Sequence, residues 1–349
     1  MKKIICAIAT IALIGCEEAP KDYLTFSGQI TDKNSDSIVI SNKTYSKVIE
    51  VNEDGTFSDT LKVDAGPYNF YDGGESTSLF LKNGYDLQMT LDTKMFDETI
   101  VYTGIGSETN NYLAKKNLME ETLFPPSLFD FEEDNFKAVI SEISAKKSAF
   151  LNENKGIDST LYRLEKENLD KFAGEYLEYY AQMEERRKTR AAQFADLVGQ
   201  PSPEFQDYEN YKGGTTSLNE LKGKYVYVDV WATWCGPCKR EIPSLKEVES
   251  EYHDKNIEFV SISVDNGRGY KDKSPEAAKE GWKAMIADKE MGGIQLYADN
   301  NWESDFVKGY KIRGIPRFIL IGPDGNVIDP DAPRPSSPRL KKLFESLNI

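Results

Sequence analysis

Histidine is nearly missing from this chain, and cysteine is scarce. His253 is the only histidine in 349 residues, and there are four cysteines. A closed zinc site needs four ligands, which come mostly from these two residue types. Cys235 and Cys238 are the one closely spaced cysteine pair, and no second pair completes a ligand set. We therefore expect no metal site and no bound cofactor.

An excess of positive charge is also missing. Lysine and arginine number 43 against 58 aspartate and glutamate residues, so the formal net charge is −15 at pH 7. A strongly acidic surface repels the phosphates of nucleic acids and of anionic lipids. No basic stripe interleaved with aromatic residues runs along the sequence. The composition argues against nucleic-acid binding.

Residues 1–15 predict a secretory signal segment. Two lysines precede the uncharged apolar residues 4–14, a stretch too short to span a bilayer as a mature helix. The tetrad Leu13-Ile14-Gly15-Cys16 resembles the bacterial lipobox, in which the cysteine is lipidated and becomes the new N-terminus. The resemblance implies a lipid anchor at Cys16, in the cell envelope, on the periplasmic or outer side of a membrane. The alternative is a plain signal peptide in which the cysteine stands by chance.

Residues 16–105 predict a small antiparallel β domain, built as a sandwich or a barrel. Asp54-Gly55 and Asn83-Gly84 are dipeptides typical of hairpin turns. After the second dipeptide, apolar and polar residues alternate from residue 85 to residue 91, as on a strand with one buried face.

Residues 106–197 predict a helical segment. Apolar residues recur at helical spacing between residues 136 and 143 and again between residues 161 and 183. The charged run at residues 184–188 is interpreted as a solvated helix face. The tyrosines of this segment pack as a core stripe or, alternatively, face a partner.

Residues 198–349 alternate between strand and helix patterns. This order, β-α-β at the start and β-β-α at the end, predicts an α/β domain whose mixed sheet is covered by helices on both faces. The expected strands are 225–230, 257–264, 318–321 and 327–328, and the expected helices are 235–252, 275–287 and a last one that begins after Ser337.

The segment Trp234-Cys235-Gly236-Pro237-Cys238 stands between an apolar strand and a helix. A cysteine at a helix N-terminus meets unpaired backbone N–H groups, which favour the thiolate. We expect Cys235 to be the more exposed cysteine and the nucleophile, and Cys238 to be the resolving thiol. A purely structural disulfide is the alternative, although a two-residue loop restricts the unfolded chain little.

Residues 198–349 resemble the thioredoxin fold, in its membrane-tethered TlpA/ResA-like branch. The opening segment 199–205 and the Trp-Cys-Gly-Pro-Cys motif match this branch. So do Gly314-Ile315-Pro316 before a strand and Pro243 in the helix after the cysteines. Asp229, six residues before Cys235, matches the buried acid of thioredoxins, although many extracytoplasmic relatives have another residue there.

The resemblance implies a role for each matched residue. Asp229 accepts a proton while Cys238 resolves the mixed disulfide; an outward-facing strand residue is the alternative. The Ile315–Pro316 bond is cis and lies beside the cysteine pair, where it presents backbone to a substrate strand; an ordinary trans proline is the alternative. The expected substrate-binding residues are Ile315 and Pro316 together with Trp234, Gly236 and Pro237.

The resemblance implies an extracytoplasmic, membrane-anchored thiol–disulfide oxidoreductase that reduces protein disulfides. Members of this branch commonly reduce cysteines of apocytochrome c before haem attachment, and they receive electrons from a membrane thiol carrier. A Gly-Pro gap with no histidine between the cysteines is typical of reducing thioredoxins. We therefore expect protein disulfides and a membrane thiol donor as partners.

Two other functions stay open. A thiol peroxidase needs the motif Pro-x-x-x-Thr-x-x-Cys. With Cys235 as its cysteine, this chain has Val228 where the motif has proline and Ala232 where it has threonine. A binding or adaptor lipoprotein would use the two N-terminal segments to capture a partner, with the thiol site secondary.

Overall fold

The computed structural model describes residues 21–349, and the predicted signal segment and Cys16 lie outside the described residues. The chain forms two compact units. The first runs to Phe124 and includes Ser141–Ala173, and the second comprises Pro125–Ile140 and Gly174–Ile349. The segment 106–197 is therefore shared between the two units. Within residues 21–349, no helix combines the length and the apolar character needed to cross a membrane.

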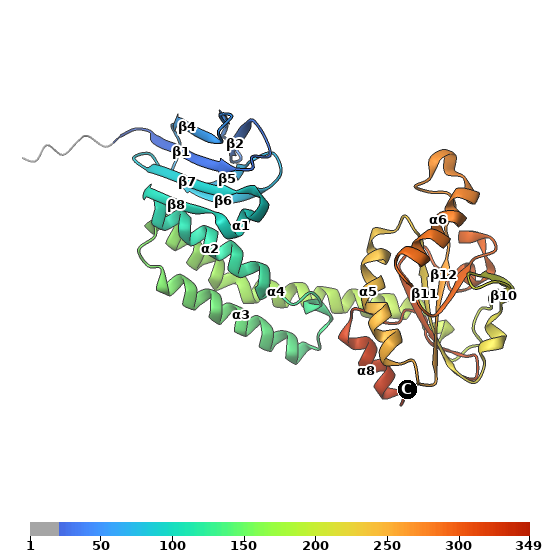
Figure 1. Cartoon of the computed structure of the whole chain (residues 1–349). Coiled ribbons are helices and arrows are strands. Elements are labelled where there is room, and N and C mark those ends of the chain that lie inside the picture. The colour runs from blue at the N-terminus through green and yellow to red at the C-terminus, as the bar shows by residue number, and fades with distance from the viewer. Residues whose placement is uncertain (1–20) are drawn as a thin grey trace, which may run out of the picture. The chain divides into compact units, whose positions relative to one another are not determined.

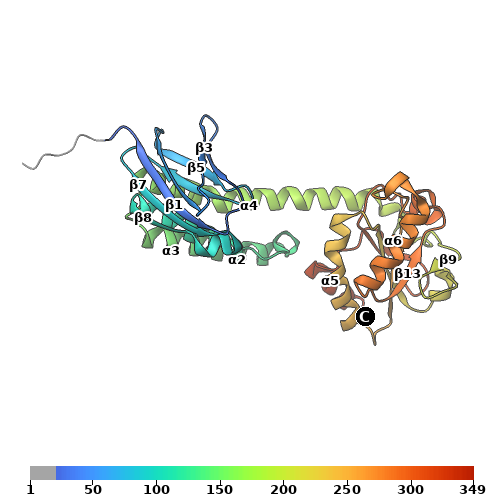
Figure 2. The same cartoon turned by 45° about the horizontal axis from the view of Figure 1, so that its top comes forward.

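The first unit contains two four-stranded sheets (Figure 2), in the orders β4-β1-β7-β8 and β3-β2-β5-β6. Phe26 of one sheet packs against Phe70 of the other, with ring centroids 6.5 Å apart, so the core lies between the sheets as in a sandwich. The antiparallel pattern has one exception, since β1 pairs in parallel with β7. The strands are β1 (Leu24–Thr31), β2 (Ser37–Ser41), β3 (Ser46–Glu50), β4 (Thr56–Leu61), β5 (Gly66–Tyr71), β6 (Ser76–Leu81), β7 (Asp86–Asp92) and β8 (Val101–Ile105).

Both predicted dipeptides lie at turns, but each turn connects a strand of one sheet to a strand of the other, so the prediction of hairpins is wrong. Gly55 lies between β3 and β4 and Gly84 between β6 and β7, with φ of 82° and 92°. Such positive φ values are open to glycine at little steric cost, which explains the residue type at both turns.

Three long helices follow: α2 (Ser107–Leu123), α3 (Glu133–Glu153) and α4 (Ser159–Gln193). Asn110 of α2 is fully buried, and its side chain bonds both the backbone N–H and the carbonyl oxygen of Phe80 in β6. The Asn111 side chain bonds the backbone of Tyr102 in β8 in the same way. The two amides thus satisfy strand backbone groups and hold α2 against the β domain. The predicted helical spacing is confirmed by α3 and α4.

The second unit is built around a seven-stranded sheet in the order β10-β9-β13-β12-β11-β14-β15. The strand that precedes the cysteines, β11, pairs in parallel with β12 and antiparallel with β14, so the predicted mixed sheet is confirmed. The strands are β9 (Tyr208–Asn210), β10 (Thr215–Thr216), β11 (Tyr225–Trp231), β12 (Ile257–Ser263), β13 (Ile294–Tyr297), β14 (Arg317–Ile321) and β15 (Val327–Asp329).

Helices cover both faces of this sheet (Figure 1): α5 (Gly236–Glu251) and α8 (Pro338–Ser346) on one, α6 (Pro275–Asp288) and α7 (Asp305–Gly309) on the other. Alternate residues of β11 serve the two cores. Tyr227 packs against Phe344 of α8, whereas Val228 shares the opposite core with Trp282 of α6. The near-continuous apolar sequence of β11 follows from burial on both faces.

The end of α4 and residues 125–140, which include the start of α3, belong to the second unit. Tyr180 is buried, stacks on Phe136 and donates a hydrogen bond to the Phe131 carbonyl oxygen at 2.9 Å, whereas Tyr179 is 46% exposed. Arg339 of α8 pairs with Glu184 at 2.7 Å. The interpretation of residues 184–188 as a solvated face is therefore wrong for Glu184, because an arginine distant in sequence packs against it.

Candidate active site

Cys235 and Cys238 form a disulfide at the junction of β11 and α5. The sulfur atoms are 1.99 Å apart and the Cα atoms 5.3 Å apart, a separation usual for a disulfide. Cys235 is the N-cap of α5, and its sulfur accepts a hydrogen bond from the Cys238 backbone N–H at 3.2 Å. Both cysteines are only 4% exposed, so the expected difference in their exposure is not present in the disulfide form.

The helix that follows supplies the electrostatic setting of Cys235. The first backbone N–H groups of α5 have no partner within the helix, and the dipole places positive charge at this end. After reduction, this environment stabilises the thiolate of Cys235 more than an apolar core would stabilise the thiolate of a buried cysteine. Pro243 lies inside α5, as the resemblance implied.

Asp229 lies in β11 and is 6% exposed, so the outward-facing alternative is wrong. Burial, together with the nearby Glu241 and Glu249, raises the pKa of its carboxyl to about 8. Glu241 lies in α5, one turn after Cys238. Because Glu241 raises the pKa of Asp229, the Asp229 carboxyl lies on the side of the sheet that α5 covers. Among residues 21–349, nothing forms a hydrogen bond with its Oδ1 atom. With a pKa of about 8, most of this carboxyl holds a proton at neutral pH.

A second buried carboxylate fixes the loop that carries the cysteines. Asp265 accepts hydrogen bonds from the backbone N–H of Thr233 at 3.0 Å and from its hydroxyl at 2.7 Å. Ser263 donates to the same carboxylate at 2.8 Å. Burial raises the pKa of Asp265, while these hydrogen bonds act in the opposite direction.

The sequence analysis did not identify Asp265. A signal was available, because Asp265 follows the β12 strand and Thr233 follows β11, and the carboxyl ends of neighbouring parallel strands meet at one edge of a sheet. Glu241 was missed as well. It is 8% exposed and accepts hydrogen bonds from the backbone N–H and the hydroxyl of Ser336, which ties α5 to the segment before α8.

The two tryptophans beside the cysteines differ in their surroundings. Trp231 is 1% exposed and packs in the core. Trp234 is partly buried, its ring centroid lies 6.5 Å from that of Trp302, and the Arg268 guanidinium lies over the ring at 4.3 Å. Trp234 therefore borders the site with an aromatic face that already has a cationic neighbour.

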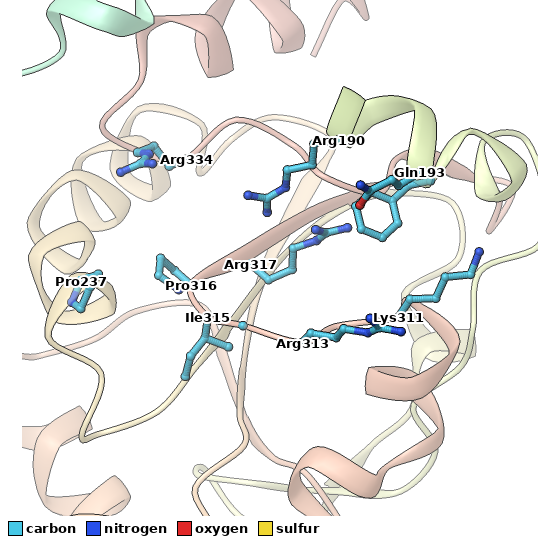
Figure 3. Close-up of a pocket in the computed structure, with 11 residues that line it drawn as sticks. Arg190, Gln193, Pro237, Lys311, Arg313, Ile315, Pro316, Arg317 and Arg334 are labelled. Carbon is cyan, nitrogen blue, oxygen red and sulfur yellow. The ribbon is translucent and has the colours of Figure 1, made fainter. Parts of the chain in front are cut away.

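The Ile315–Pro316 bond is cis, which confirms the prediction. Pro316 and Pro237 line one cavity of about 660 Å³ (Figure 3), so the proline lies on the cysteine side of the sheet. The pairing of β14 with β11 begins at Arg317, and the Ile315 backbone lies outside that ladder. Residues 314–316 form a bend directly before β14, and they line this cavity. Gly236 is partly buried and Pro237 is exposed.

The similarity to known proteins concerns the C-terminal part of the chain. A family model described as Redoxin matches residues 197–342. The thiol-disulfide oxidoreductase ResA of Oceanobacillus iheyensis is 41% identical over 71 residues, which are 20% of this chain and 37% of that protein. ResA of Bacillus cereus is 26% identical over 38% of this chain and 68% of that protein.

A solved structure has the same likeness. The thioredoxin domain of a thiol-disulfide oxidoreductase from Bacteroides vulgatus is 27% identical, and the match covers 43% of this chain and 96% of that one, with a TM-score of 0.35. The chain thus spans roughly one third of the first ResA protein and two thirds of the second.

Proposed function

We propose that this chain, whose C-terminal domain belongs to the Redoxin family in its TlpA/ResA-like thioredoxin branch, is an extracytoplasmic reductant of protein disulfides. The domain is a thiol–disulfide oxidoreductase. One observation carries the proposal most strongly. The Cys235–Cys238 pair opens α5, while Pro237 and the cis Pro316 line the same open cavity.

The reaction begins with the reduced pair. The Cys235 thiolate attacks one sulfur of a substrate disulfide, and the bond between the substrate sulfurs breaks. A mixed disulfide forms, and the released substrate sulfur takes up a proton. The substrate strand lies along Ile315 during this step and is held by backbone hydrogen bonds.

Resolution uses the second cysteine. Cys238 loses its proton and attacks the Cys235 sulfur, which restores the Cys235–Cys238 disulfide and releases the second substrate thiol. Asp229 accepts the Cys238 proton in its ionised form, about a tenth of the population at pH 7 for a pKa of about 8. Two electrons and two protons pass from the dithiol to the substrate disulfide. A membrane thiol donor then reduces the pair again.

Trapping tests this function. Cys238→Ser should stall the reaction as a mixed disulfide on Cys235, which non-reducing electrophoresis and mass spectrometry would identify. Cys235→Ser is the matched control and should give no adduct, since it lacks the attacking sulfur. Wild-type protein that fails to reduce a peptide disulfide with a dithiol donor present would contradict the proposal.

The lipid anchor and the substrate are finer parts of the proposal. The apolar residues 4–14 and Cys16 support attachment to the envelope, and cysteines of apocytochrome c are the substrate that the family resemblance suggests. Cells grown with labelled palmitate should incorporate the label into wild-type protein and into Cys6→Ser, but not into Cys16→Ser. Label that stays on Cys16→Ser would count against this anchor.

A further inference from the structure

The cavity beside the cysteine pair is strongly basic, although the chain as a whole carries a formal charge of −15. No acidic side chain lines it among the described residues. The charged groups that do are Arg190, Lys311, Arg313, Arg317 and Arg334. We call this cavity, which Pro237 and Pro316 also line, the basic cavity.

The five cations come from separate segments of the second unit (Figure 3). Arg190 belongs to the last turns of α4, Arg317 opens β14, and Arg334 lies in the segment before α8. Lys311 and Arg313 belong to the loop that leads to Pro316. Such a grouping of like charges is unfavourable unless an anion joins it.

Carboxylates of the protein neutralise only part of this charge. Asp331 pairs with both Arg190, at 2.5 Å, and Arg317, at 3.0 Å. Asp196 pairs with Lys311 at 2.7 Å, and Glu241 lies 3.6 Å from Arg334. Three carboxylates therefore face five cations, which leaves two positive charges in excess. Within residues 21–349, Arg313 forms no ion pair. Asp329 lies near Arg317, and burial raises the pKa of both Asp329 and Asp331.

Arg317 gives an independent indication that the cavity binds an anion. Its side chain is 4% exposed and its guanidinium lies 4.1 Å from the centre of the Phe194 ring. Nε donates to the Pro330 carbonyl oxygen at 2.9 Å and Nη1 pairs with Asp331. Nη2 is buried and has no hydrogen-bond partner in the described part of the chain. A buried charged donor left without a partner is unfavourable, and a carboxylate is the group that an arginine fork binds best.

We propose that the basic cavity binds an acidic side chain of the substrate, so that the preferred substrates are protein disulfides with aspartate or glutamate beside the reacting cysteine. This inference rests on the proposed reduction of protein disulfides. Pro316 connects the two sites, since it lines the cavity together with Pro237, which lies between the two cysteines in the chain, and Arg317 follows it directly. A substrate strand that pairs with the backbone at Ile315 therefore runs past the cavity, and an acidic side chain of that strand reaches the arginines.

Matched peptides test the proposal. Two peptides with one internal disulfide, both acetylated and amidated, differ only in glutamate or glutamine beside the first cysteine. Wild type should reduce the glutamate peptide with a kcat/KM about tenfold higher or more, and the difference should shrink with salt. Arg313→Gln and Arg334→Gln should bring this ratio close to one. Arg240→Gln removes an arginine near the cysteines but outside the cavity, and it should keep the ratio.

Equal rates for the two peptides with wild type would overturn the proposal. So would a ratio that Arg240→Gln lowers as much as the cavity variants do, because the effect would then come from general charge. A glutamine peptide with a free C-terminus that is preferred over the amidated glutamate peptide would assign the cavity to a terminal carboxylate instead.

A binding measurement separates this inference from the proposed function. Labelled glutamate and glutamine peptides with serine in place of both cysteines are titrated with the oxidised full chain, and fluorescence anisotropy reports binding. Tighter binding of the glutamate peptide supports the cavity even if wild type reduces neither disulfide. Arg317→Lys keeps the charge but loses the fork, so with an unchanged circular dichroism spectrum it should weaken the glutamate preference; an undiminished preference would exclude Arg317 from the site.

Discussion

The Asp265 carboxylate holds Thr233 through both the backbone N–H, at 3.0 Å, and the hydroxyl, at 2.7 Å. Tyr270 donates a further hydrogen bond to the same hydroxyl at 2.9 Å. Thr233 is two residues before Cys235, so this contact positions the loop from which the nucleophile projects. Both residues are buried, and each group would lose its partner in an apolar setting if the other were removed.

Asp265→Asn should destabilise the protein by about 1–3 kcal/mol, because the amide cannot accept from both groups of Thr233 and from Ser263. Urea unfolding measures this loss, and reduction of a peptide disulfide should slow as the loop becomes less well positioned. Asp254→Asn, with a side chain 85% exposed, is the control and should change neither property. A variant at Asp265 as stable and as active as wild type would show that the loop needs no such anchor.

Asp229→Asn should slow resolution of the mixed disulfide. The wild-type rate of resolution should rise with pH as the carboxyl ionises around its pKa of about 8 and becomes able to accept a proton. In the variant, this rise should be missing. Single-turnover kinetics between pH 6 and pH 9.5 measure the step directly, and superimposable profiles for the two proteins would count against the acid–base role.

The same carboxyl should make stability depend on pH. In the unfolded chain its pKa is about 3.9, so between about pH 4 and pH 8 the folded state holds a proton that the unfolded state has lost. The contribution to stability therefore falls as pH rises through this window, and each pKa unit corresponds to about 1.4 kcal/mol. Relative to wild type, Asp229→Asn should gain stability between pH 5 and pH 8.5. Parallel stability curves in urea would contradict this.

Equilibration with glutathione should give a reducing potential for the cysteine pair. The Gly-Pro gap and the lack of a nearby histidine leave the thiolate only moderately stabilised, so we expect a value near that of thioredoxin, about −270 mV. A more stabilised thiolate would favour the reduced form and make the protein an oxidant. A potential near that of DsbA, about −120 mV, would be incompatible with a reductant.

Arg339→Gln should destabilise the second unit. Arg339 donates to the carbonyl oxygens of Asp130 and Phe131 at 2.8 and 3.1 Å and pairs with Glu184, and the loss should be about 1–3 kcal/mol. Lys341→Gln on the same helix removes an exposed pair with Glu251 and should cost about 0.5 kcal/mol or less. Chemical unfolding compares the two. Equal losses would mean that Arg339 does not join these segments.

Local patterns determined much of this protein. The apolar strand before Cys235, the helix after it and the glycines at the turns depend on residues that are neighbours in the chain, so local patterns predicted the α/β domain and the β domain. The cis bond before Pro316 was predicted from the family resemblance alone. The division into two compact units could not be predicted from local patterns, because it depends on contacts between residues far apart in sequence. The ion pair of Arg339 with Glu184 is one such contact.

Only the tertiary structure decided which charged residues act together. Nothing in the sequence around Arg190, Arg313 and Arg334 groups them together, and the one signal for Asp265 is its place after a strand. Their roles depend on which strand ends and helix ends the sheet brings together. Charge at a distance acts through space and not along the chain, so no local spacing records it. The basic cavity beside the cysteines is therefore a property of the fold.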